Sequence, residues 1–343
     1  MAIKVGILGA TGFTGQELLV LLLRHPQVEI AWLSSESQPG TSYGKVYPQF
    51  QGRISAGADI LRSFEDVKVT QPDVVFSCLP HGASAACAAP FLANGKTLVI
   101  DLSADFRLQD LDAYQKAYAH AHPMPDVLKQ SVYGLTEIHG AAVKGAKLIA
   151  TPGCYPTSAL LPLIPLLKAG VIAADGIIID SKSGVSGAGK KPTETTHYVN
   201  ANESVAAYGV GDKHRHRVEI MEQLSLAAGR KLEVLFTPHL MPMERGILST
   251  IYCDLAPGKD GADAEACLKA AYEGSDFVRV RDDFPRTADV KHTNFCHMKS
   301  YQPEGSGKLI IVSVIDNMVK GASGQALQNM NLALGLPATL GLA

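Results

Sequence analysis

A glycine-rich turn close to the start of the chain, Gly9-Ala-Thr-Gly12-Phe-Thr-Gly15, restricts the possible folds more than any other feature. It follows a short apolar run at residues 4–8 and precedes a leucine-rich stretch of helical character at residues 13–24. Glycines between a first strand and a first helix let backbone N–H groups approach a pyrophosphate at the helix N-terminus. The spacing GxxGxxG is a variant of GxGxxG, so the turn predicts a dinucleotide-binding unit. A glycine-rich turn without a ligand is the alternative.

Short apolar runs alternate with helical runs through the rest of the first half. Continuous apolar strands separated by helices are typical of a parallel sheet that is covered on both faces. A stretch at residues 38–57, rich in Gly, Pro, Ser and Tyr, is predicted to be a long surface excursion. Further strands are predicted at residues 28–33, 74–79, 97–102 and 148–150, with a helix at residues 83–94.

The second half has more strands and fewer helices, and several strands alternate between apolar and polar residues. This pattern indicates a mixed or antiparallel sheet in a second, α+β domain. With 343 residues the chain is long enough for two domains. Strands are predicted at residues 176–180, 232–236, 247–254, 277–281, 292–298 and 309–316, and helices from residues 219–224 onward, near 264–273 and at 324–334.

Charge and cysteine usage narrow the function classes. With 31 basic and 33 acidic residues, the net charge of −2 gives no field that would attract nucleic acid or an anionic membrane. The first apolar run is too short for a signal-peptide core, and the one around residues 18–23 is far shorter than the roughly 20 residues that span a bilayer. The six cysteines are scattered without a CxxC pair, which favours reduced thiols in a cytoplasmic protein.

The segment after the second predicted strand bears on the choice of cofactor. An NAD site usually ends this strand in a carboxylate that binds the ribose 2′-OH, whereas here Ser34, Ser35 and Ser37 supply hydroxyls that can accept a 2′-phosphate. The segment therefore favours NADP, although Glu36 leaves NAD possible and the serines could simply form a turn. The candidate cofactor contacts in this half are Gly9, Thr11, Gly12, Phe13, Thr14, Gly15, Ser34, Ser35, Ser37, Cys78, Leu79 and Pro80.

One cysteine, Cys154, has the sequence context of a nucleophile. Gly153 precedes it after a predicted strand, and Pro156 favours the first turn of an apolar helix. A cysteine at a helix N-terminus lies at the positive end of the helix dipole, which lowers the pKa of its thiol. The alternative is a buried structural cysteine, which is the interpretation for Cys87, Cys253 and Cys267 and for the thiol of Cys78.

A basic segment at residues 211–220 supplies candidates for proton transfer. His214 and His216 could act as general acid or base, and the arginines beside them could bind a carboxylate or phosphate. A solvated basic loop and a metal site are the alternatives, and since no further ligand lies nearby, no metal is expected. A glycine-rich loop at residues 181–191 could cover a nicotinamide or bind phosphate. No tyrosine has a lysine four positions later, which excludes the short-chain dehydrogenases.

Taken in order along the chain, these motifs resemble the N-acetyl-γ-glutamyl-phosphate reductase family of arginine biosynthesis, which is related to aspartate-semialdehyde dehydrogenase. The matching segments are GATGFTG at 9–15, DLSADFRL at 101–108, PGCYPT at 152–157, SGVSGAG at 183–189, HRHRVEI at 214–220 and DNMVKGASGQALQNMN at 316–331. The family usually has Thr-Pro where this chain has Arg217 and Val218, which leaves the start of the following helix and the local charge open.

The resemblance implies a Rossmann NADP-binding domain at residues 1–153 and 316–343. A catalytic and oligomerisation domain of the glyceraldehyde-phosphate-dehydrogenase type would span residues 154–315, in a homo-oligomer that is often tetrameric. It also implies that Ser183, Gly184 and Asn317 lie near the cofactor. In the implied reaction, Cys154 attacks the γ-acyl phosphate, phosphate leaves, and hydride transfer from NADPH to the thioester yields the semialdehyde.

Two aspects of the site stay open at this point. His216 is preferred to His214 as the acid/base because it is expected to lie closer to the helix start, and Arg107, Arg215 and Arg245 are candidates for binding the substrate. The alternative substrates are a carrier-bound aminoadipyl phosphate of the lysine pathway and aspartyl phosphate. A non-enzymatic alternative is an NADP-sensing regulator, which would have no need of the cysteine and paired histidines.

Overall fold

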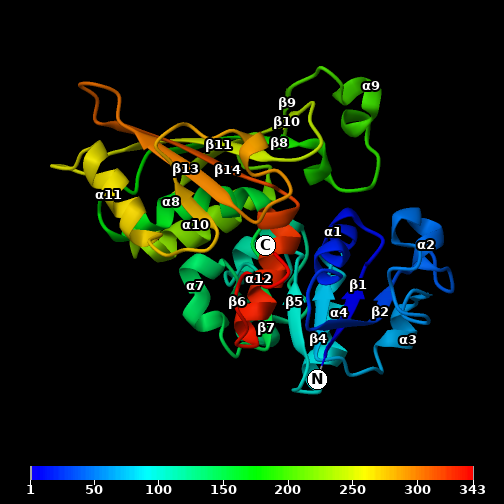
Figure 1. The fold of residues 1–343 in the computed structure, drawn as a ribbon. Helices are drawn as coiled ribbons and strands as arrows, with labels where there is room; N and C mark the ends of the chain where they lie inside the picture. Colours follow the sequence, from blue (N-terminus) through cyan, green and yellow to red (C-terminus); the bar gives the residue numbers. More distant parts are fainter. Residues whose placement is uncertain (1, 343) are drawn as a thin grey trace. The chain divides into compact units, whose positions relative to one another are not determined.

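The computed structural model describes residues 2–342. The chain forms two compact units, Met1–Pro152 with Ala322–Ala343 and Gly153–Gly321 (Figure 1). The expected first domain comprised residues 1–153 and 316–343. It differs from the first unit mainly in its C-terminal segment, because residues 316–321 belong to the second unit and the first unit resumes only at Ala322.

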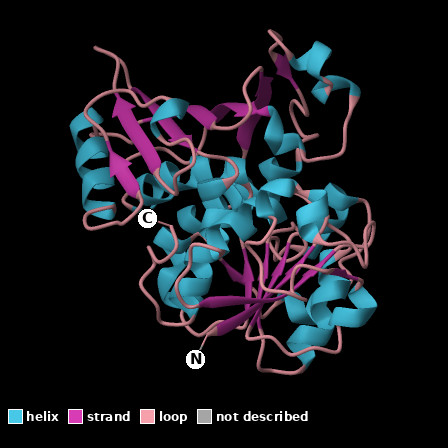
Figure 2. Cartoon of the chain, turned by 45° about the vertical axis from the view of Figure 1, so that its right-hand side comes forward, coloured by secondary structure: helices cyan, strands magenta, loops and turns pink. Residues whose placement is uncertain are grey.

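The first unit is built on a parallel sheet of seven strands in the order β3-β2-β1-β4-β5-β7-β6. Helices lie on both sides of this fan of strands (Figure 2). Its central strand β4 is buried along its whole length, as expected for a sheet covered on both faces. The strands are β1 (Ile3–Leu8), β2 (Val28–Ser34), β3 (Leu61–Arg62), β4 (Val74–Ser77), β5 (Leu98–Asp101), β6 (Val132–Tyr133) and β7 (Leu148–Ala150). The helices are α1 (Phe13–Leu22), α2 (Tyr43–Val46), α3 (Phe64–Val67), α4 (Ser84–Ala93), α5 (Leu111–Tyr118), α6 (Pro125–Leu128), α7 (Thr136–Val143) and α12 (Gly324–Ala333).

The C-terminal helix α12 is an integral part of the first unit, where it contacts α1, α7 and β5. Buried polar side chains fix its position. Asn329 donates through Nδ2 to the Gly134 carbonyl at 2.8 Å and accepts from the Thr136 hydroxyl at 2.9 Å. Asn331 Oδ1 lies 3.0 Å from Nε2 of His25 near the end of α1. The asparagines near the chain end therefore satisfy buried polar groups of distant segments.

The predicted surface excursion at residues 38–57 is in part a packed segment. Tyr43 and Phe50 are almost fully buried in an aromatic cluster with Tyr47. The Tyr43 hydroxyl donates to the Ala10 carbonyl at 3.0 Å, and the Tyr47 hydroxyl donates to the Thr11 carbonyl at 2.6 Å. The prediction of a surface loop was therefore incomplete, because these aromatic residues support the glycine turn from outside the sheet.

The second unit contains a mixed sheet in the order β12-β13-β14-β11-β8-β10-β9, which confirms the predicted α+β class. Parallel pairs join β10 to β8 and β12 to β13, while the remaining neighbours are antiparallel. The strands are β8 (Ile177–Gly184), β9 (Ala206–Ala207), β10 (Val234–Met241), β11 (Ile247–Asp254), β12 (Val278–Val280), β13 (Cys296–Tyr301) and β14 (Lys308–Ile315). The helices are α8 (Cys154–Lys168), α9 (Tyr198–Ala201), α10 (Arg215–Ala228) and α11 (Gly261–Ala271).

Helices α8, α10 and α11 pack against this sheet, and strands such as β11 alternate between buried and more exposed residues. The strand predicted at residues 292–298 begins only at Cys296. His292 has a left-handed backbone (φ 64°), and its N–H donates to the Asp316 carboxylate at 2.7 Å, so the chain turns there before the strand can start. Strand β8 runs four residues beyond its predicted end, into the glycine-rich loop.

Candidate active site

The glycine turn connects β1 to α1 with the geometry that its sequence predicts. Gly9 has a positive φ of 73°, and a Cβ there would lie 2.9 Å from the Cys78 carbonyl oxygen. A Cβ at Gly15 would lie 2.7 Å from the Gly9 carbonyl oxygen, so the start of α1 packs closely on the turn. A Cβ at Gly12 would meet only the Gly9 oxygen, at an ordinary 3.6 Å. Gly12 is the N-cap of α1, and no side chain caps the helix there.

Hydroxyl groups gather beside this turn at the end of β2. Thr11 Oγ1 lies 3.1 Å from Ser35 Oγ, which lies 3.2 Å from Ser37 Oγ. The Gly9 N–H donates to Ser34 Oγ at 3.4 Å. The predicted cofactor contacts from β1 and β2 are thus brought together at the carboxyl edge of the parallel sheet, where open α/β sheets bind their ligands.

The remaining predicted contacts of the first unit lie on the adjoining segments. Phe13 and Thr14 open α1, and the Ser323 hydroxyl donates to the Thr14 carbonyl at 2.9 Å. Cys78, Leu79 and Pro80 follow β4 at the same edge of the sheet. Burial raises the pKa of the Cys78 thiol, which favours its neutral form.

Two aspartates that the sequence analysis did not single out hold the segment after β4. Asp105 accepts from the N–H groups of Gly82 at 2.7 Å and Ala85 at 3.0 Å, and so caps α4. Asp101 is fully buried and accepts from the hydroxyls of Ser84 at 2.6 Å and Ser103 at 2.8 Å. Burial raises the pKa of Asp101. The Asp-x-Ser-x-Asp spacing at 101–105 was the available signal for this support.

Arg107, a predicted substrate-binding residue, is 7% exposed in the first unit. Its Nε donates to the Thr151 carbonyl and its Nη2 to the Leu102 carbonyl, both at 2.8 Å. These bonds fix the backbone that leads from β7 toward the cysteine. The observed position of Arg107 is therefore that of a backbone support.

In the second unit, Cys154 is the first residue of α8, and Gly153 is its N-cap without a side-chain cap. The Gly153 N–H donates at 2.9 Å to Glu219 Oε1, whose side chain is buried. A Cβ at Gly321 would lie 2.8 Å from the Cys154 Cβ, so only glycine leaves room for the cysteine there. The thiol-bearing residue therefore lies at the positive end of a 15-residue helix dipole.

The two histidines lie closer to α10 than predicted. The helix begins at Arg215 rather than near Glu219, His214 is its N-cap, and His216 is its second residue. His214 Nδ1 accepts from the His216 N–H at 3.2 Å. A Cβ at Gly153 would lie 2.5 Å from His216 Nε2, so the His216 ring rests directly on the residue before the cysteine.

Aromatic rings surround His214. The ring centroids of Tyr155, Tyr208 and Phe236 lie 5.3–5.5 Å from that of His214, and the His216 ring lies at 5.0 Å. Burial, and to a lesser degree the neighbouring Arg215 guanidinium, lowers the pKa of His214 to about 4. His214 is therefore a neutral imidazole at neutral pH.

Tyr155 and Tyr208 are two site residues that the sequence analysis missed. Their hydroxyls lie 2.9 Å apart, and burial raises the pKa of both phenols. Tyr155 follows Cys154 directly, and its ring meets the edges of both histidine rings. Its position within the PGCYPT segment was a usable signal, whereas nothing in the sequence placed Tyr208 against it.

The departure at residues 217–218 does not disturb the histidines. Arg217 donates through Nε to the Val234 carbonyl at 2.9 Å and pairs with Glu233 at 3.2 Å, so its charge is directed to β10. Arg215 is exposed on the first turn of α10.

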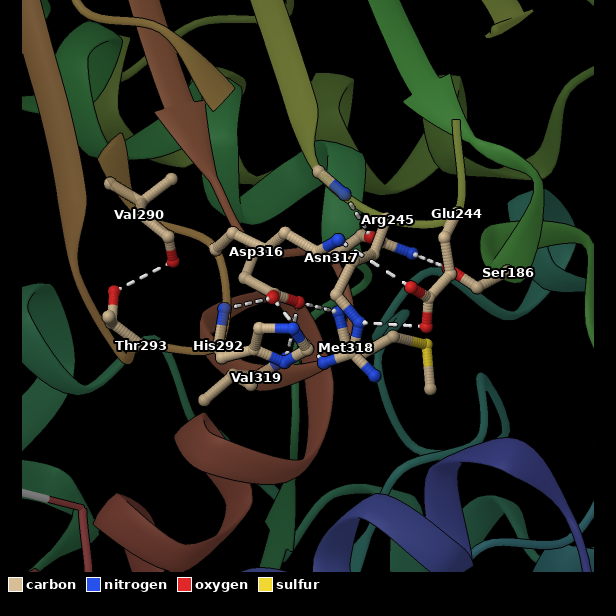
Figure 3. Close-up of polar contacts among 12 residues, drawn as sticks. Ser186, Glu244, Arg245, Val290, His292, Thr293, Asp316, Asn317, Met318 and Val319 are labelled. Carbon is tan, nitrogen blue, oxygen red and sulfur yellow. Dashed lines mark hydrogen bonds and ion pairs between the residues drawn. The ribbon is translucent and has the colours of Figure 1, made fainter. Parts of the chain in front are cut away.

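Two further predicted residues of the second unit, Arg245 and Asn317, lie in one polar cluster with Asp316 (Figure 3). Asp316 is fully buried and accepts from the N–H groups of Met318 at 2.8 Å and Val319 at 3.2 Å, while Arg245 Nη1 lies 3.5 Å from its other oxygen. Asn317 accepts from Gly246 N–H at 2.7 Å and donates to Ser186 Oγ at 3.0 Å.

Ser183 and Gly184 end β8 next to this cluster. A Cβ at Gly184 would lie 2.6 Å from the backbone nitrogen of Arg245, so the end of β8 and the backbone at Arg245 are in close contact. The structure thereby brings Ser183, Gly184, Arg245 and Asn317 into one neighbourhood of the second unit.

Residues 2–342 lack two features that would point to other functions. They contain no group of three or more side chains arranged to hold a metal ion. Within the same range, no helix combines the length and apolar character needed to cross a bilayer.

Comparison with known proteins matches both units to semialdehyde dehydrogenase models, an NAD binding domain at residues 4–146 and a dimerisation domain at residues 154–317. A protein of Rhodospirillum rubrum named N-acetyl-gamma-glutamyl-phosphate reductase is 48% identical over 99% of this chain and 97% of its own length. The chain belongs to the N-acetyl-γ-glutamyl-phosphate reductase family. Another member of this family, from Geobacter sp. strain M21, is 47% identical over 99% of this chain and 98% of its own. The family predicted from the sequence motifs is thus confirmed.

The N-acetyl-γ-glutamyl-phosphate reductase family is also related in fold to solved structures of low identity. Aspartate semialdehyde dehydrogenase II from Vibrio cholerae superposes with a TM-score of 0.73 at 20% identity, covering 98% of this chain and 99% of that one. The Candida albicans aspartate semialdehyde dehydrogenase, solved with NADP, gives 0.69 at 18% identity, covering 97% and 98%. The predicted two-domain fold is confirmed, and the cytoplasmic location stays a prediction.

Proposed function

We propose that this protein reduces N-acetyl-γ-glutamyl phosphate to N-acetylglutamate semialdehyde and phosphate, with Cys154 as the nucleophile and NADPH as the reductant. The observation that carries the proposal is the contact of His216 Nε2 with Gly153, the residue immediately before a cysteine that begins a helix. A thiol at a helix N-terminus beside an imidazole is the arrangement that nucleophilic catalysis at an acyl carbon requires.

Cys154 carries the acyl group. Its thiolate attacks the γ-carbonyl carbon, the C–O bond to phosphate breaks, and phosphate leaves with the bond electrons to give a thioester. The cofactor supplies a hydride to that carbonyl carbon when bound. The resulting oxyanion is held by a proton from His216, and this proton returns to the imidazole as the carbonyl re-forms and the C–S bond breaks. The sulfur keeps the bond electrons, so the semialdehyde is released and the thiolate is restored. The N-terminal N–H groups of α8 stabilise the thiolate form at the beginning and end of this sequence.

His216 is the group that moves the proton. His214 cannot serve near neutral pH, because its Nδ1 already accepts the His216 N–H and burial keeps its ring neutral with a pKa of about 4. Its role is to cap α10 and so fix His216 at the second helical position. Glu219 accepts a hydrogen bond from the Gly153 N–H and so holds the backbone just before Cys154 against α10. His216 is thus the second residue of α10, whereas the sequence analysis placed it before the helix.

NADP is proposed as the cofactor for reasons of residue chemistry. The N-terminus of α1 has no side-chain cap, and Gly12 is not required by the protein's own packing, so backbone N–H groups there are suited to a pyrophosphate. The hydroxyls of Thr11, Ser34, Ser35 and Ser37 are suited to an adenosine 2′-phosphate. The Candida albicans structural relative was solved with NADP. Ser183, Gly184 and Asn317 are the proposed contacts from the second unit.

The substrate is proposed to be held by arginines. Arg245 is 10% exposed beside the buried carboxylate of Asp316, which holds its guanidinium in place. Arg215 is exposed on the same helix turn as His216, and its guanidinium is of the type that binds a carboxylate or phosphate. Arg107 acts by supporting the backbone before the cysteine.

A homo-oligomer, expected to be a tetramer, is proposed from the match of residues 154–317 to a dimerisation domain. Multi-angle light scattering of the purified protein tests this. A mass of 36.4 kDa, that of one chain, at micromolar concentration would contradict it.

The test of the proposed reaction is phosphate-dependent reduction of NADP in the oxidative direction. N-acetylglutamate semialdehyde is compared with aspartate semialdehyde, for the wild type, Cys154→Ala and the control Cys267→Ala, which removes a thiol of α11. We expect preference for the acetylated substrate and loss of turnover only in Cys154→Ala. Turnover that survives Cys154→Ala would refute the mechanism, and equal rates with aspartate semialdehyde would refute the substrate.

A further inference from the structure

An arginine at the end of a strand too short to be predicted lies beside the serine hydroxyls. Strand β3 pairs with β2 in parallel, with Arg62 in register with Ser34, and the Ser35 N–H continues the ladder to the Arg62 carbonyl at 3.0 Å. Register partners of neighbouring strands direct their side chains to the same face of a sheet, about 4.8 Å apart. The Arg62 side chain therefore starts beside Ser34, whose hydroxyl accepts from Gly9 of the glycine turn.

The Arg62 guanidinium is available to a ligand. Arg62 is half-buried, and within residues 2–342 its guanidinium makes no hydrogen bond or ion pair. Its charge does act on the nearby carboxylate of Asp66, whose pKa is lowered mainly by its bonds to Ser63 and to a lesser degree by Arg62. Two other arginines of this unit differ, while Arg24 is exposed just after α1. Arg107 is committed to two backbone carbonyls, and Arg53 lies over the Phe50 ring at 5.7 Å. Arg62 thus presents an uncommitted fork of donors at the carboxyl edge of the sheet.

The carboxylate that could favour NAD is occupied elsewhere. Glu36 lies among the three serines, but its Oε1 accepts from the Phe64 N–H at 2.6 Å, at the first residue of α3. Asp66, the other acidic group near Arg62, accepts from both the N–H and the hydroxyl of Ser63. Glu36 therefore directs one carboxylate oxygen to the Phe64 N–H rather than to a ribose 2′-hydroxyl.

We infer that Arg62 is the residue that makes this protein select a 2′-phosphorylated dinucleotide, with the hydroxyls of Ser35 and Ser37 completing the phosphate contacts. This inference rests on the proposed function, which assigns NADP to the site without a cationic partner. A guanidinium can form two parallel charge-assisted hydrogen bonds with a phosphate, which a set of hydroxyls cannot replace. The bond from the Phe64 N–H to Glu36 Oε1 holds this carboxylate at the start of α3 and so weakens the repulsion that a phosphate would meet.

The test uses two adenosine nucleotides that lack the nicotinamide, so it is independent of the thiol chemistry. Binding of 2′,5′-ADP and 5′-AMP to the full-length protein is measured by titration calorimetry. The variants are Arg62→Ala, Arg62→Lys and the control Arg53→Ala. We expect Arg62→Ala to weaken 2′,5′-ADP binding roughly tenfold or more and to leave 5′-AMP binding within about twofold. Arg62→Lys should keep part of the preference, and Arg53→Ala all of it.

The outcomes separate this inference from the proposed function. A wild type that prefers 2′,5′-ADP and an Arg62→Ala variant that keeps this preference would overturn the role of Arg62 alone. A wild type without any preference would overturn the assignment of NADP itself. If Arg62→Ala fails to fold, Arg62→Lys and Arg62→Gln decide, because both keep the aliphatic stem that packs at the strand end. A tenfold gain in 2′,5′-ADP affinity for Glu36→Gln would also overturn the inference, since Glu36 would then oppose the phosphate.

Discussion

Replacement of Gly153 by alanine tests whether the contact between His216 and the helix start is essential for the reaction. Gly153 has φ −65° and ψ 158°, a conformation that alanine adopts without strain, so the effect is steric alone. The new Cβ would lie 2.5 Å from Nε2, 2.8 Å from Cε1 and 2.9 Å from Cδ2 of His216. An ordinary contact begins near 3.4 Å, so the ring must retreat by about 0.9 Å.

Displacement of a catalytic group by about 1 Å typically lowers the rate on the order of 100-fold. The same overpacking should lower the free energy of unfolding by about 1–3 kcal/mol. The assay is kcat/KM in the phosphate-dependent direction, together with the thermal unfolding midpoint. Iodoacetamide labelling of Cys154 across pH then shows whether the imidazole still influences the thiol.

Gly307→Ala is the matched control. Gly307 belongs to the same unit, has an ordinary φ, and a Cβ there meets nothing within 4 Å. We expect this variant to match the wild type in rate and stability. Full activity in Gly153→Ala would refute the reasoning, because His216 would then act without its contact to the helix start. Equal losses in both glycine variants would show that the effect is not specific to the site.

Three further outcomes are expected. Because the pKa of His214 is lowered to about 4, the native state favours its neutral form, so its contribution to stability is complete above about pH 6.5 and declines as the pH falls toward 4. His214→Asn keeps a cap acceptor for α10 and should reduce this decline in the urea unfolding midpoint. An unchanged decline would contradict the assignment to His214. Tyr208→Phe should lower the free energy of unfolding by about 1 kcal/mol, because the hydrogen bond to the Tyr155 hydroxyl is lost. The control Tyr252→Phe, on the exposed sheet face, should leave it unchanged. Equal urea unfolding midpoints for the two variants would argue against the bond. Asp316→Ala should lower the free energy of unfolding by about 3–5 kcal/mol, since it removes the buried anionic partner of Arg245 and the acceptor of three backbone N–H groups. Arg245 would keep the more exposed Glu244 as an ion-pair partner. A shift below about 1 kcal/mol in chemical unfolding would disprove the role of Asp316.

The sequence predicted those features that are set by local glycine and proline residues at the ends of helices and strands. The start of α8 at Cys154 follows from Gly153 and Pro156, and the β1–α1 turn follows from its three glycines. The start of α10 escaped prediction because its cap is the imidazole of His214, whereas caps are usually Ser, Thr, Asp or Asn. A helix start with an unusual capping residue cannot be recognised from the residue types around it.

Features that depend on distant contacts could not be read from the sequence. Arg107 bonds to Thr151, 44 residues away, so a buried support and a substrate ligand look alike in the chain. In the sequence, Glu36 leaves NAD possible as the cofactor. Only the structure shows that its carboxylate accepts a hydrogen bond from the N–H of Phe64, 28 residues away at the start of α3. The excursion at residues 38–57 has the composition of a loop, but Tyr43 and Phe50 find a core that other segments provide.

The return of α12 to the first unit has a consequence for synthesis on the ribosome. Thr136 and Gly134 find their partner Asn329 only after nearly the whole chain has emerged, and His25 must wait for Asn331. The nucleotide-binding unit is therefore the first to be translated but cannot finish folding before the other unit has been made. A ribosome stalled within residues 153–321 would hold this unit open, with the apolar surface that α12 covers exposed to chaperones and proteases.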